Sequence, residues 1–580
     1  MSNLTVNIVI VFSLLIFISA CQPSSKSTAP DNAVEEQTIE FDKLFAQFDD
    51  INKPGASVAV LQDGEVVFSK GYGSANLEYD IPVSPDTMFH VASVSKQFTV
   101  FAILLLAEEG KLDFDDDVRQ YIPEVPDFGH TITLRHLASH TSGMRDQWNL
   151  LRMAGWRLDD VITTEHVLKM VAKQKELNFK PGEEFLYSNT GFTLLAEVVA
   201  RVSGKSFAQF SQERLFTPLN MSNSLFYDDH QKIVSNRAYS YEPIDNGYQK
   251  SVLNYANVGA TSLFTTAEDL LKWSENFTKT TVGSPAIIEQ MNTLATLNNG
   301  DTFGGAYGQF ISHYNGIKYI QHSGGDAGFR SYLARFPEQN LAIAILNNGA
   351  DARPWELALQ IAERFLDINP PPPPPQNAIA DAFMESMSPK QTPSAFDLSK
   401  NELSEDILNA YVGHYWNEPD AYSREIYLDN GILMYSRGKN DVSPLAAVNE
   451  NTFKMLNVEG EIFVEFTEDG EQKLMTVRVD NIDTYVSIAY TPVEVTETWL
   501  SQFTGSYYSP ELSSTYHFSP HKDQLKISHY RLSDHFITPV KDDFFRSQVG
   551  DISFERDDSG AVNGFRISNG RVRNLYFRKL

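Results

Sequence analysis

The sequence predicts an α+β fold, in which one antiparallel sheet covered by helices is followed by two small all-β, barrel-like repeats. Three observations support this prediction. Strand-like runs lie at both ends of residues 40–368, and amphipathic helical patterns lie between them. A run of prolines, residues 370–375, then interrupts the chain. Residues 403–580 contain only strand and turn patterns, and they repeat themselves.

The first region begins with a β-hairpin. In GASVAVLQDGEVVFSKGYG two β-rich runs are joined by Asp63-Gly64, a dipeptide that favours a tight hairpin turn. In NTGFTLLAEVVARVSG apolar residues recur at helical spacing from Phe192 to Val202, and Gly204 predicts the end of that helix. Two or three strands are predicted toward the end of this region by the segment KYIQHSGGDAGFRSYLARFPEQNLAIAILNN. A closing helix is predicted by WELALQIAERFLD, which follows it.

The C-terminal part contains an internal repeat. ILNAYVGHYW returns as WLSQFTGSYY, with Gly413 and Gly505 lying 92 residues apart. We therefore expect a proline-rich linker over 369–402 and repeats over 403–491 and 492–580. Two copies of this length make either two small barrels or the two halves of one larger barrel, and we expect two.

The N-terminus has the pattern of an export signal. Residues 1–20 contain an apolar run that is too short for a comfortable membrane span. The run ends in ISAC, which resembles the bacterial lipobox, so we expect a lipid on Cys21 and a flexible tether over 21–39. The segment before the run has no Lys or Arg, and the alternative is an uncleaved N-terminal anchor. The expected location is the bacterial cell envelope, facing the periplasm, and Gln22 suits outer-membrane sorting by analogy.

Charge and cysteine content exclude several functions. A formal net charge of −28 argues against a nucleic-acid partner, because few cations would neutralise phosphates. The single cysteine permits neither an intramolecular disulfide nor a cysteine-based zinc site. We expect no metal and no cofactor. The sequence indicates no oligomeric state.

The most informative pair of residues is Ser93 and Lys96, in the apolar segment HVASVSKQF. A serine hydroxyl is a poor nucleophile unless a base takes its proton, and at this spacing on a helix the two side chains share one face. Burial and the positive helix N-terminus would both disfavour the ammonium form of the lysine. The spacing alone is weak evidence, because it recurs at Ser436…Lys439 and Ser519…Lys522.

Two further segments add chemistry. PGEEFLYSNTGF supplies Tyr187, which could transfer a proton, and Asn189, which could hold a substrate carbonyl. Tyr255…Asn257 offers the same spacing. In QHSGGDAGF, His322 precedes glycines whose backbone N–H groups could stabilise an oxyanion.

In this order, Ser93-x-x-Lys96, Tyr187-Ser188-Asn189 and His322-Ser323-Gly324 resemble the three motifs of the penicillin-recognising serine hydrolases. The closer likeness is to the peptidase S12-like branch of class C β-lactamases, D-aminopeptidases and serine esterases. The resemblance implies a serine β-lactamase-like fold with an all-helical lobe and with the nucleophile at its junction with the sheet. It favours Tyr187 over Tyr255, and the C-terminal repeats resemble lipocalin-like barrels.

The resemblance also implies roles for individual residues. Ser93 would be the acylated nucleophile, and Lys96 and Tyr187 would transfer protons. The expected substrate-binding residues are Asn189, His322, Ser323 and Gly324. The backbone N–H groups of Ser93 and Gly325 would form the oxyanion hole.

One departure from the family pattern is His322, which stands where many relatives have lysine. It replaces a permanent cation by a group titrating near pH 6.5, so a substrate carboxylate would be held less firmly. We therefore expect a D-aminopeptidase-, amidase- or esterase-like hydrolase acting on small peptides, amides or esters. One alternative is a β-lactamase or D,D-carboxypeptidase. An alternative of another class is a penicillin-binding sensor that does not turn over.

Other polar residues have simpler explanations. His136 and His140 lie in RHLASHTSG, without the G-x-S-x-G motif of a Ser-His-Asp enzyme, and we expect structural roles. The acidic run 113–117 lacks the spacing of a calcium loop and is expected to be solvated.

Overall fold

The computed structural model describes residues 40–366, 403–419, 422–438, 441–458, 461–479, 483–547 and 549–580. Cys21, the predicted tether and the predicted linker 369–402 lie outside these residues. The chain divides into two compact units, Met1–Gln47 and Phe48–Leu580. Within the first unit, residues 40–45 are helical.

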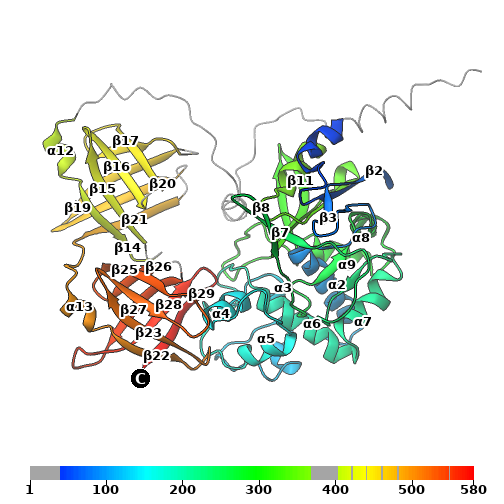
Figure 1. Cartoon of the computed structure of the whole chain (residues 1–580), viewed down its shortest axis with the longest axis horizontal. Helices are drawn as coiled ribbons and strands as arrows, with labels where there is room; N and C mark the ends of the chain where they lie inside the picture. The colour runs from blue at the N-terminus through cyan, green and yellow to red at the C-terminus, as the bar shows by residue number, and fades with distance from the viewer. Residues whose placement is uncertain are drawn as a thin grey trace, which may run out of the picture. The chain divides into compact units, whose positions relative to one another are not determined.

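The first part of the second unit is built on a six-stranded antiparallel sheet with the strand order β10-β11-β12-β13-β1-β2 (Figure 1). Its strands are β1 Ala56–Gln62, β2 Glu65–Tyr72, β10 Phe310–Tyr314, β11 Ile317–Asp326, β12 Phe329–Phe336 and β13 Leu341–Asn347. Asp63 (φ 52°) and Gly64 (φ 83°) form the turn between β1 and β2, which confirms the predicted hairpin. β1 pairs with β13, so strands from the two ends of the region meet in one sheet.

Helices cover both faces of this sheet. The central strand β13 is buried at every residue, as expected for a strand without a solvent-facing side. Two helices pack against it, α8 Ala267–Lys279 and α10 Pro354–Ala362. The alternate residues Ala342, Ala344 and Leu346 belong to the main hydrophobic core. The predicted antiparallel sheet with covering helices, including the closing helix, is confirmed.

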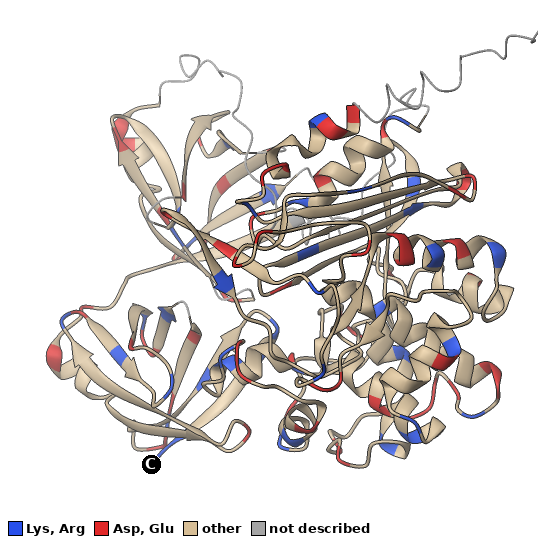
Figure 2. Ribbon diagram, turned by 45° about the vertical axis from the view of Figure 1, so that its right-hand side comes forward, with Lys and Arg blue, Asp and Glu red and all other residues tan. Residues whose placement is uncertain are grey.

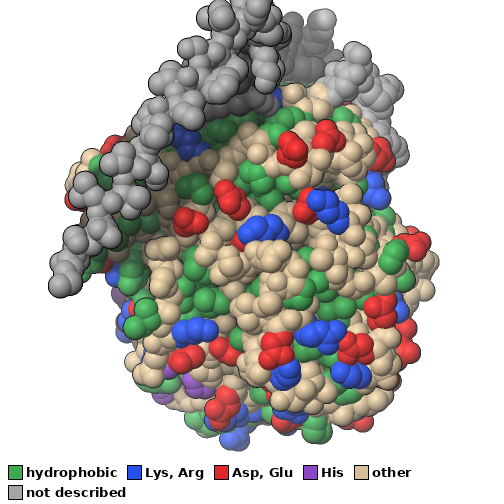
Figure 3. Space-filling view, turned by 90° about the vertical axis from the view of Figure 1, so that its right-hand side faces the viewer, with side chains coloured by type: hydrophobic (Ala, Val, Ile, Leu, Met, Phe, Trp, Pro, Cys, Tyr) green, Lys and Arg blue, Asp and Glu red, His purple; other side chains and the backbone are tan. Residues whose placement is uncertain are grey.

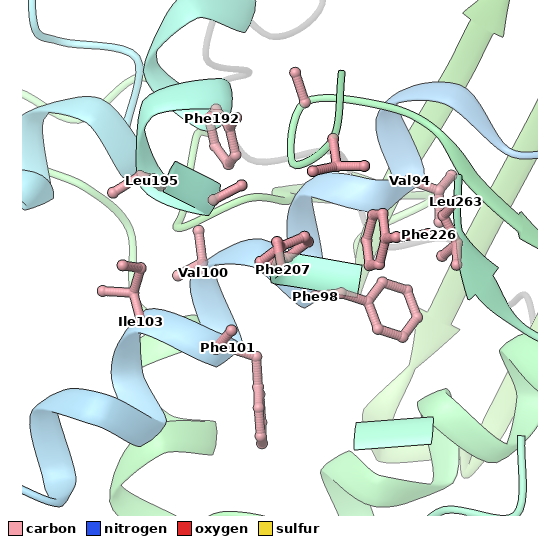
Figure 4. Close-up of a cluster of buried hydrophobic side chains, with 14 of the residues drawn as sticks. Val94, Phe98, Val100, Phe101, Ile103, Phe192, Leu195, Phe207, Phe226 and Leu263 are labelled. Atoms are coloured by element: carbon pink, nitrogen blue, oxygen red, sulfur yellow. The ribbon is translucent and has the colours of Figure 1, made fainter. Parts of the chain in front are cut away.

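The second layer is a helical lobe. Its main helices are α2 Ser95–Glu108, α3 Leu134–Ala138, α4 Gln147–Met153, α5 Thr164–Val171, α6 Asn189–Ser203, α7 Phe207–Ser211 and α9 Pro285–Met291. α2 lies in the middle of the lobe and contacts α6 and α9. Its residues are buried from Ser95 to Leu106, so this helix has no solvent-facing side over that length. Figure 4 shows its side chains, among them Phe98 and Val100, packed against Phe192 of α6 and Phe207 of α7.

Short strands connect the two layers. They are β3 Ser74–Asn76, β4 Ile81–Pro82, β5 Phe89–His90, β6 Leu225–Phe226, β7 Ser240–Ile244, β8 Gly247–Ser251 and β9 Leu263–Thr265. β5 pairs with β9 and leads through the 3-10 turn η2 (Ala92–Val94) into α2. This connection brings the start of α2 to the sheet.

The C-terminal part forms two closed barrels, one from β14 to β21 and one from β22 to β29, with neighbouring strands in chain order. The first barrel comprises β14 Gly413–Asn417, β15 Tyr422–Asp429, β16 Ile432–Gly438, β17 Asp441–Ala447, β18 Thr452–Met455, β19 Ile462–Asp469, β20 Gln472–Val479 and β21 Asp483–Tyr490. The second comprises β22 Gly505–Ser509, β23 Ser514–His521, β24 Gln524–Ser528, β25 His535–Lys541, β26 Phe544–Ser547, β27 Gly550–Arg556, β28 Val562–Asn569 and β29 Val572–Lys579.

The two barrels repeat one plan. A short helix precedes each, α12 Glu405–Asn409 and α13 Glu497–Ser501, and the glycines singled out in the sequence begin β14 and β22. Each barrel also has its own apolar interior. The expectation of two barrels rather than one larger barrel is confirmed.

Charged side chains of both signs are interspersed along the helices and strand ends (Figure 2). The face shown in Figure 3 likewise mixes acidic, basic and hydrophobic side chains. Within the described part of the chain, no helix is long and apolar enough to span a bilayer.

Candidate active site

Ser93 lies at the junction of the sheet and the helical lobe. It occupies the middle of η2, directly before α2. From residue 87 to residue 106 every side chain is buried except that of Ser93, which is half-buried. The preceding residue, Ala92, has a φ of 47°, a left-handed conformation that is uncommon for a residue with a Cβ. The chain therefore turns sharply here and leaves one hydroxyl accessible.

Lys96 follows one turn later and is fully buried. Its Nζ lies 3.1 Å from Ser93 Oγ, 2.9 Å from Asn189 Oδ1 and 2.7 Å from the carbonyl oxygen of Ala260. The last two atoms can only accept hydrogen bonds, so they take two N–H donors of the amine. A neutral amine then has its lone pair left for the Ser93 hydroxyl.

The environment favours this neutral form. Burial lowers the pKa of Lys96 to about 7, and the nearby Arg571 guanidinium lowers it further, while Asp326 and Asp146 act in the opposite direction. A lysine with an ordinary pKa would be almost fully protonated near neutral pH. Here a substantial fraction can accept the serine proton.

Tyr187 lies beside Ser93 and Lys96. Its ring lies 4.9 Å from Lys96 Nζ and is stacked on the His140 imidazole, with ring centroids 4.1 Å apart. Burial raises the pKa of Tyr187, and a hydrogen bond with the Ser93 side chain acts against that shift. The phenol therefore keeps its proton near neutral pH and lies in hydrogen-bonding contact with the nucleophile.

Asn189 is the first residue of α6. Its backbone N–H and its Nδ2 both donate to Asp146 Oδ2, at 2.7 and 2.8 Å. These bonds fix the amide so that Oδ1 points at Lys96. Asp146 is fully buried and also caps α4 through the N–H groups of Trp148 and Asn149.

The third predicted motif lies on β11. His322 is buried at 2% exposure beside Phe310, with ring centroids 5.4 Å apart. Its Nδ1 lies 2.6 Å from the Ser323 carbonyl oxygen, whereas its buried Nε2 has no hydrogen-bond partner among the described residues. A buried polar atom of this kind is satisfied by a substrate or a water molecule.

The structure corrects one expectation about His322. Burial, followed by the charge of Lys96, lowers the pKa of His322 to about 3. The expectation that it titrates near pH 6.5 is therefore wrong, and His322 is neutral at neutral pH. It can donate or accept one hydrogen bond but supplies no charge for a carboxylate.

The glycines of β11 lie directly against the nucleophile turn. A Cβ on Gly324 would lie 2.3 Å from both the Val91 carbonyl oxygen and Ser331 Oγ, so no larger residue fits there. Gly325 is exposed, and a Cβ on it would meet nothing closer than 3.6 Å. β10 pairs with β11 only as far as Gln321, so His322–Asp326 has β12 as its one paired strand among those described. Strand β11 also contacts the η2 turn that carries Ser93.

The competing residues lie elsewhere. Tyr255 is buried and hydrogen-bonds Asp326, so it does not take the place of Tyr187. Ser436 and Ser519 lie on barrel strands β16 and β23. His136 caps α3 together with Thr133, a structural role as expected. In the acidic run 113–117, Asp115 pairs with Arg135 and Asp117 caps a 3-10 turn. The described ranges contain no group of acidic, His or Cys side chains that could hold a metal ion.

Three residues of the site escaped the sequence analysis. Asp146 orients Asn189, and His140, for which only a general structural role was expected, supports the Tyr187 ring. Arg571 belongs to the turn between β28 and β29 of the second barrel, and its Cζ lies 4.6 Å from the centre of the Tyr187 ring. An unpaired arginine in a barrel turn carries no local signal of such a contact.

Comparison with known proteins agrees with this geometry. The family model described as Beta-lactamase matches residues 41–363. The chain is 26% identical over 300 residues to a D-aminopeptidase of Gluconobacter oxydans (strain 621H), covering 52% of this chain and 56% of that protein. It is 26% identical over 395 residues to Penicillin-binding protein 4* of Bacillus subtilis (strain 168), covering 64% and 81%. The match thus spans little more than half the length of the D-aminopeptidase.

Among solved structures, the octameric penicillin-binding protein homologue from Pyrococcus abyssi matches with a TM-score of 0.52 and 24% identity. The match covers 79% of this chain and all of that chain. At this level of identity the likeness supports the fold alone.

Proposed function

Because the chain belongs to the Beta-lactamase family, whose model matches residues 41–363, we propose that it is an active-site serine hydrolase. It cleaves amide or ester bonds of small substrates through an acyl-enzyme on Ser93. The observation that carries this proposal is the set of three contacts made by Lys96 Nζ, which leave its lone pair for Ser93 Oγ.

In the acylation step the Ser93 Oγ–H bond breaks as Oγ bonds to the substrate carbonyl carbon. The proton moves to Lys96, and the carbonyl oxygen becomes an oxyanion that the N–H groups of Ser93 and Gly325 stabilise. The bond between carbon and the leaving nitrogen or oxygen then breaks. The leaving atom takes a proton from Tyr187, which Lys96 replaces.

In the deacylation step water attacks the acyl carbon and passes one proton to the Lys96–Tyr187 pair. The carbon–Oγ bond breaks, and the same proton returns to Ser93. The products are the free acid and a regenerated serine. Ser93, Lys96 and Tyr187 then have the same protonation as at the start, so the cycle can repeat.

The substrate class follows from the third motif and from the relatives. A neutral His322 does not provide the cation that holds a β-lactam carboxylate in many relatives, which disfavours an efficient β-lactamase. The G. oxydans relative is named D-aminopeptidase. We therefore favour D-aminopeptidase-, amidase- or esterase-like cleavage of small peptides, amides or esters.

A fluorophosphonate probe and a panel of p-nitrophenyl esters and D- and L-aminoacyl anilides test the proposal. The wild-type protein should be labelled once and should release product catalytically, and Ser93→Ala should abolish both. Lys96→Ala should lower kcat/KM about 100-fold or more. One equivalent of labelling without product would instead identify a sensor. Labelling that persists in Ser93→Ala would overturn the site.

The envelope location also belongs to this proposal. It is supported by the lipobox-like ISAC sequence, in which Cys21 would carry the lipid and direct the protein to the periplasmic side of the outer membrane. Metabolic labelling with a fatty-acid analogue should modify the wild-type protein and spare Cys21→Ala. Membrane fractionation that recovers both forms unlabelled in the soluble fraction would contradict it.

A further inference from the structure

We propose that Arg571, supplied by the second barrel, binds a carboxylate on the leaving group of the substrate. This inference rests on the proposed hydrolase function and adds the substrate class to it. The preferred substrates would be short peptides whose leaving amine carries a free carboxylate close to the cleaved bond. The first observation is position: the guanidinium lies 4.6 Å from the centre of the Tyr187 ring, and the hydroxyl of that ring bonds Ser93.

The second observation is that the guanidinium is free to bind an anion. Its neighbours across the same interface are neutralised, since Arg145 pairs with Glu511, Arg573 with Glu184 and Arg566 with Glu176. No carboxylate among the described residues forms an ion pair with Arg571, and its side chain is only half-buried. The carboxylate of Asp146, whose backbone N–H bonds the Arg571 carbonyl oxygen, is occupied by Asn189 and by the N-terminus of α4.

The third observation is that the turn is held in place through its backbone. The Arg571 carbonyl oxygen accepts hydrogen bonds from the Asp146 N–H at 3.2 Å and from Asn178 Nδ2 at 3.0 Å. Asn178 Oδ1 accepts from the Arg573 N–H at 2.8 Å, and Asn149 Nδ2 donates to the Asn569 carbonyl oxygen at 3.0 Å. None of these bonds uses the Arg571 guanidinium.

A buried ion pair supports the same turn. Arg145 is fully buried and donates to both carboxylate oxygens of Glu511, at 2.9 and 2.7 Å, and to the Arg573 carbonyl oxygen at 2.8 Å. The guanidinium of Arg571 is therefore presented by a fixed backbone. Preorganisation of this kind lowers the entropic cost of binding an anion.

The electrostatic field of Arg571 reaches the reacting groups. Its charge lowers the pKa of Lys96, of Tyr187 and of His140. A planar guanidinium can hold a carboxylate through two parallel hydrogen bonds. His322 is neutral, so it does not compete with Arg571 for an anion.

The side of the site that Arg571 serves follows from Tyr187. In the proposed reaction Tyr187 gives its proton to the leaving group, so the leaving group lies against the phenol. Arg571 covers the ring of that same phenol. The bound carboxylate therefore belongs to the leaving group rather than to the acyl group.

A matched pair of substrates tests the inference, D-alanylglycine and D-alanylglycinamide, which differ only in the leaving-group carboxylate. The wild-type protein should favour the carboxylate. Arg571→Gln should lower the ratio of kcat/KM for D-alanylglycine to kcat/KM for D-alanylglycinamide about 10- to 100-fold, whatever common change the loss of its charge causes in both. Arg571→Lys should show an intermediate preference for D-alanylglycine, because lysine keeps the positive charge but lacks the paired N–H donors of the guanidinium.

Arg573→Gln is the control, because it removes an arginine of the adjoining strand β29 whose charge is already paired with Glu184. It should affect both substrates equally. Equal losses on both substrates in Arg571→Gln, or no loss on either, would overturn the inference.

Ligand binding without turnover keeps the two proposals distinguishable. N-acetylglycine should raise the unfolding temperature of the wild-type protein more than N-acetylglycinamide does, and Arg571→Gln should remove the difference. If the protein shows this difference but is not labelled on Ser93, the proposed function is contradicted and the carboxylate site is supported. If the protein is labelled and active but does not show the difference, only the carboxylate site is contradicted.

Discussion

Asn189 donates two hydrogen bonds to a single oxygen of the buried Asp146 carboxylate, at 2.7 and 2.8 Å. This arrangement commits the amide nitrogen of Asn189 and leaves its oxygen for Lys96. Asp146 therefore sets the orientation of the amide that bonds the Lys96 amine, although Asp146 itself has no hydrogen bond with Lys96.

Asp146→Asn should lower kcat/KM about 10-fold or more, because an amide at this position presents a donor to the donors of Asn189. The negative charge of Asp146 also raises the pKa of Lys96, so its removal should shift the acidic limb of the pH–kcat/KM profile to lower pH. Asp269→Asn is the control, since Asp269 is equally buried but bonds Ser224. A profile that does not move in Asp146→Asn would leave Asp146 a merely structural role.

The wild-type pH profile should rise from acid to neutral pH. Lys96 acts as a base only when neutral, and its pKa lies at about 7, so kcat/KM should increase through that pH and then level off. Initial rates with a neutral ester over pH 5 to 9 measure the midpoint. A midpoint near pH 10, the range of an ordinary lysine, would contradict the buried neutral amine.

Gly324→Ala and Gly325→Ala should behave differently although the residues are adjacent. The Gly324 methyl group would overlap the Val91 carbonyl oxygen, displacing the turn that carries Ser93 at a cost of about 1–3 kcal/mol of stability and most of the activity. The Gly325 methyl group makes only ordinary van der Waals contact with the Arg330 side chain and leaves the backbone N–H in place. Urea unfolding and ester turnover separate the two variants. Equal behaviour would show that β11 does not lie against the nucleophile turn as described.

Acid should destabilise the protein below pH 6.5. His322 has a folded-state pKa of about 3, so between these values the unfolded chain binds a proton that the folded chain does not. Stability falls by up to roughly 1.4 kcal/mol per pH unit for such a residue as the pH falls. His322→Gln should flatten the dependence of unfolding free energy on pH, and the exposed His230→Gln should not. Identical slopes in the two variants would contradict a neutral buried His322.

Glu511→Gln should destabilise the protein by about 3 kcal/mol, because it leaves the fully buried Arg145 without its main counter-charge. Glu184→Gln is the matched control at the same interface. Its pair with Arg573 is 46% and 38% exposed, and its loss should cost less than about 1 kcal/mol. Denaturant unfolding of the two variants provides the comparison. Similar small losses in both would show that the Arg145–Glu511 pair is solvated.

The part of the site that could be predicted from sequence is the part with local spacing. Ser93 and Lys96 are one helical turn apart, and Tyr187 and Asn189 flank the start of α6, so short motifs fix their relation. The sheet could be predicted for a similar reason, because short β-rich runs mark its strands and the Asp63-Gly64 turn marks a pair.

The rest depends on contacts between distant segments. The burial of His322 is produced by Phe310 and Tyr187 packing around it, and a sequence motif does not report such packing. In the sequence Asp146 is typical of an ordinary helix cap, and it does cap α4. Arg571 lies in a turn of a barrel whose own fold gives no reason to expect a catalytic neighbour.

The hydrogen bonds between the Arg571 backbone and residues Asp146 and Asn178 have a consequence for biosynthesis. Ser93, Lys96 and Tyr187 all precede the last β-hairpin in the chain, so the N-terminal groups of the site emerge before Arg571 does. If Arg571 has the proposed role, carboxylate selectivity requires the docked second barrel, and proteolysis of this hairpin should lower selectivity more than activity.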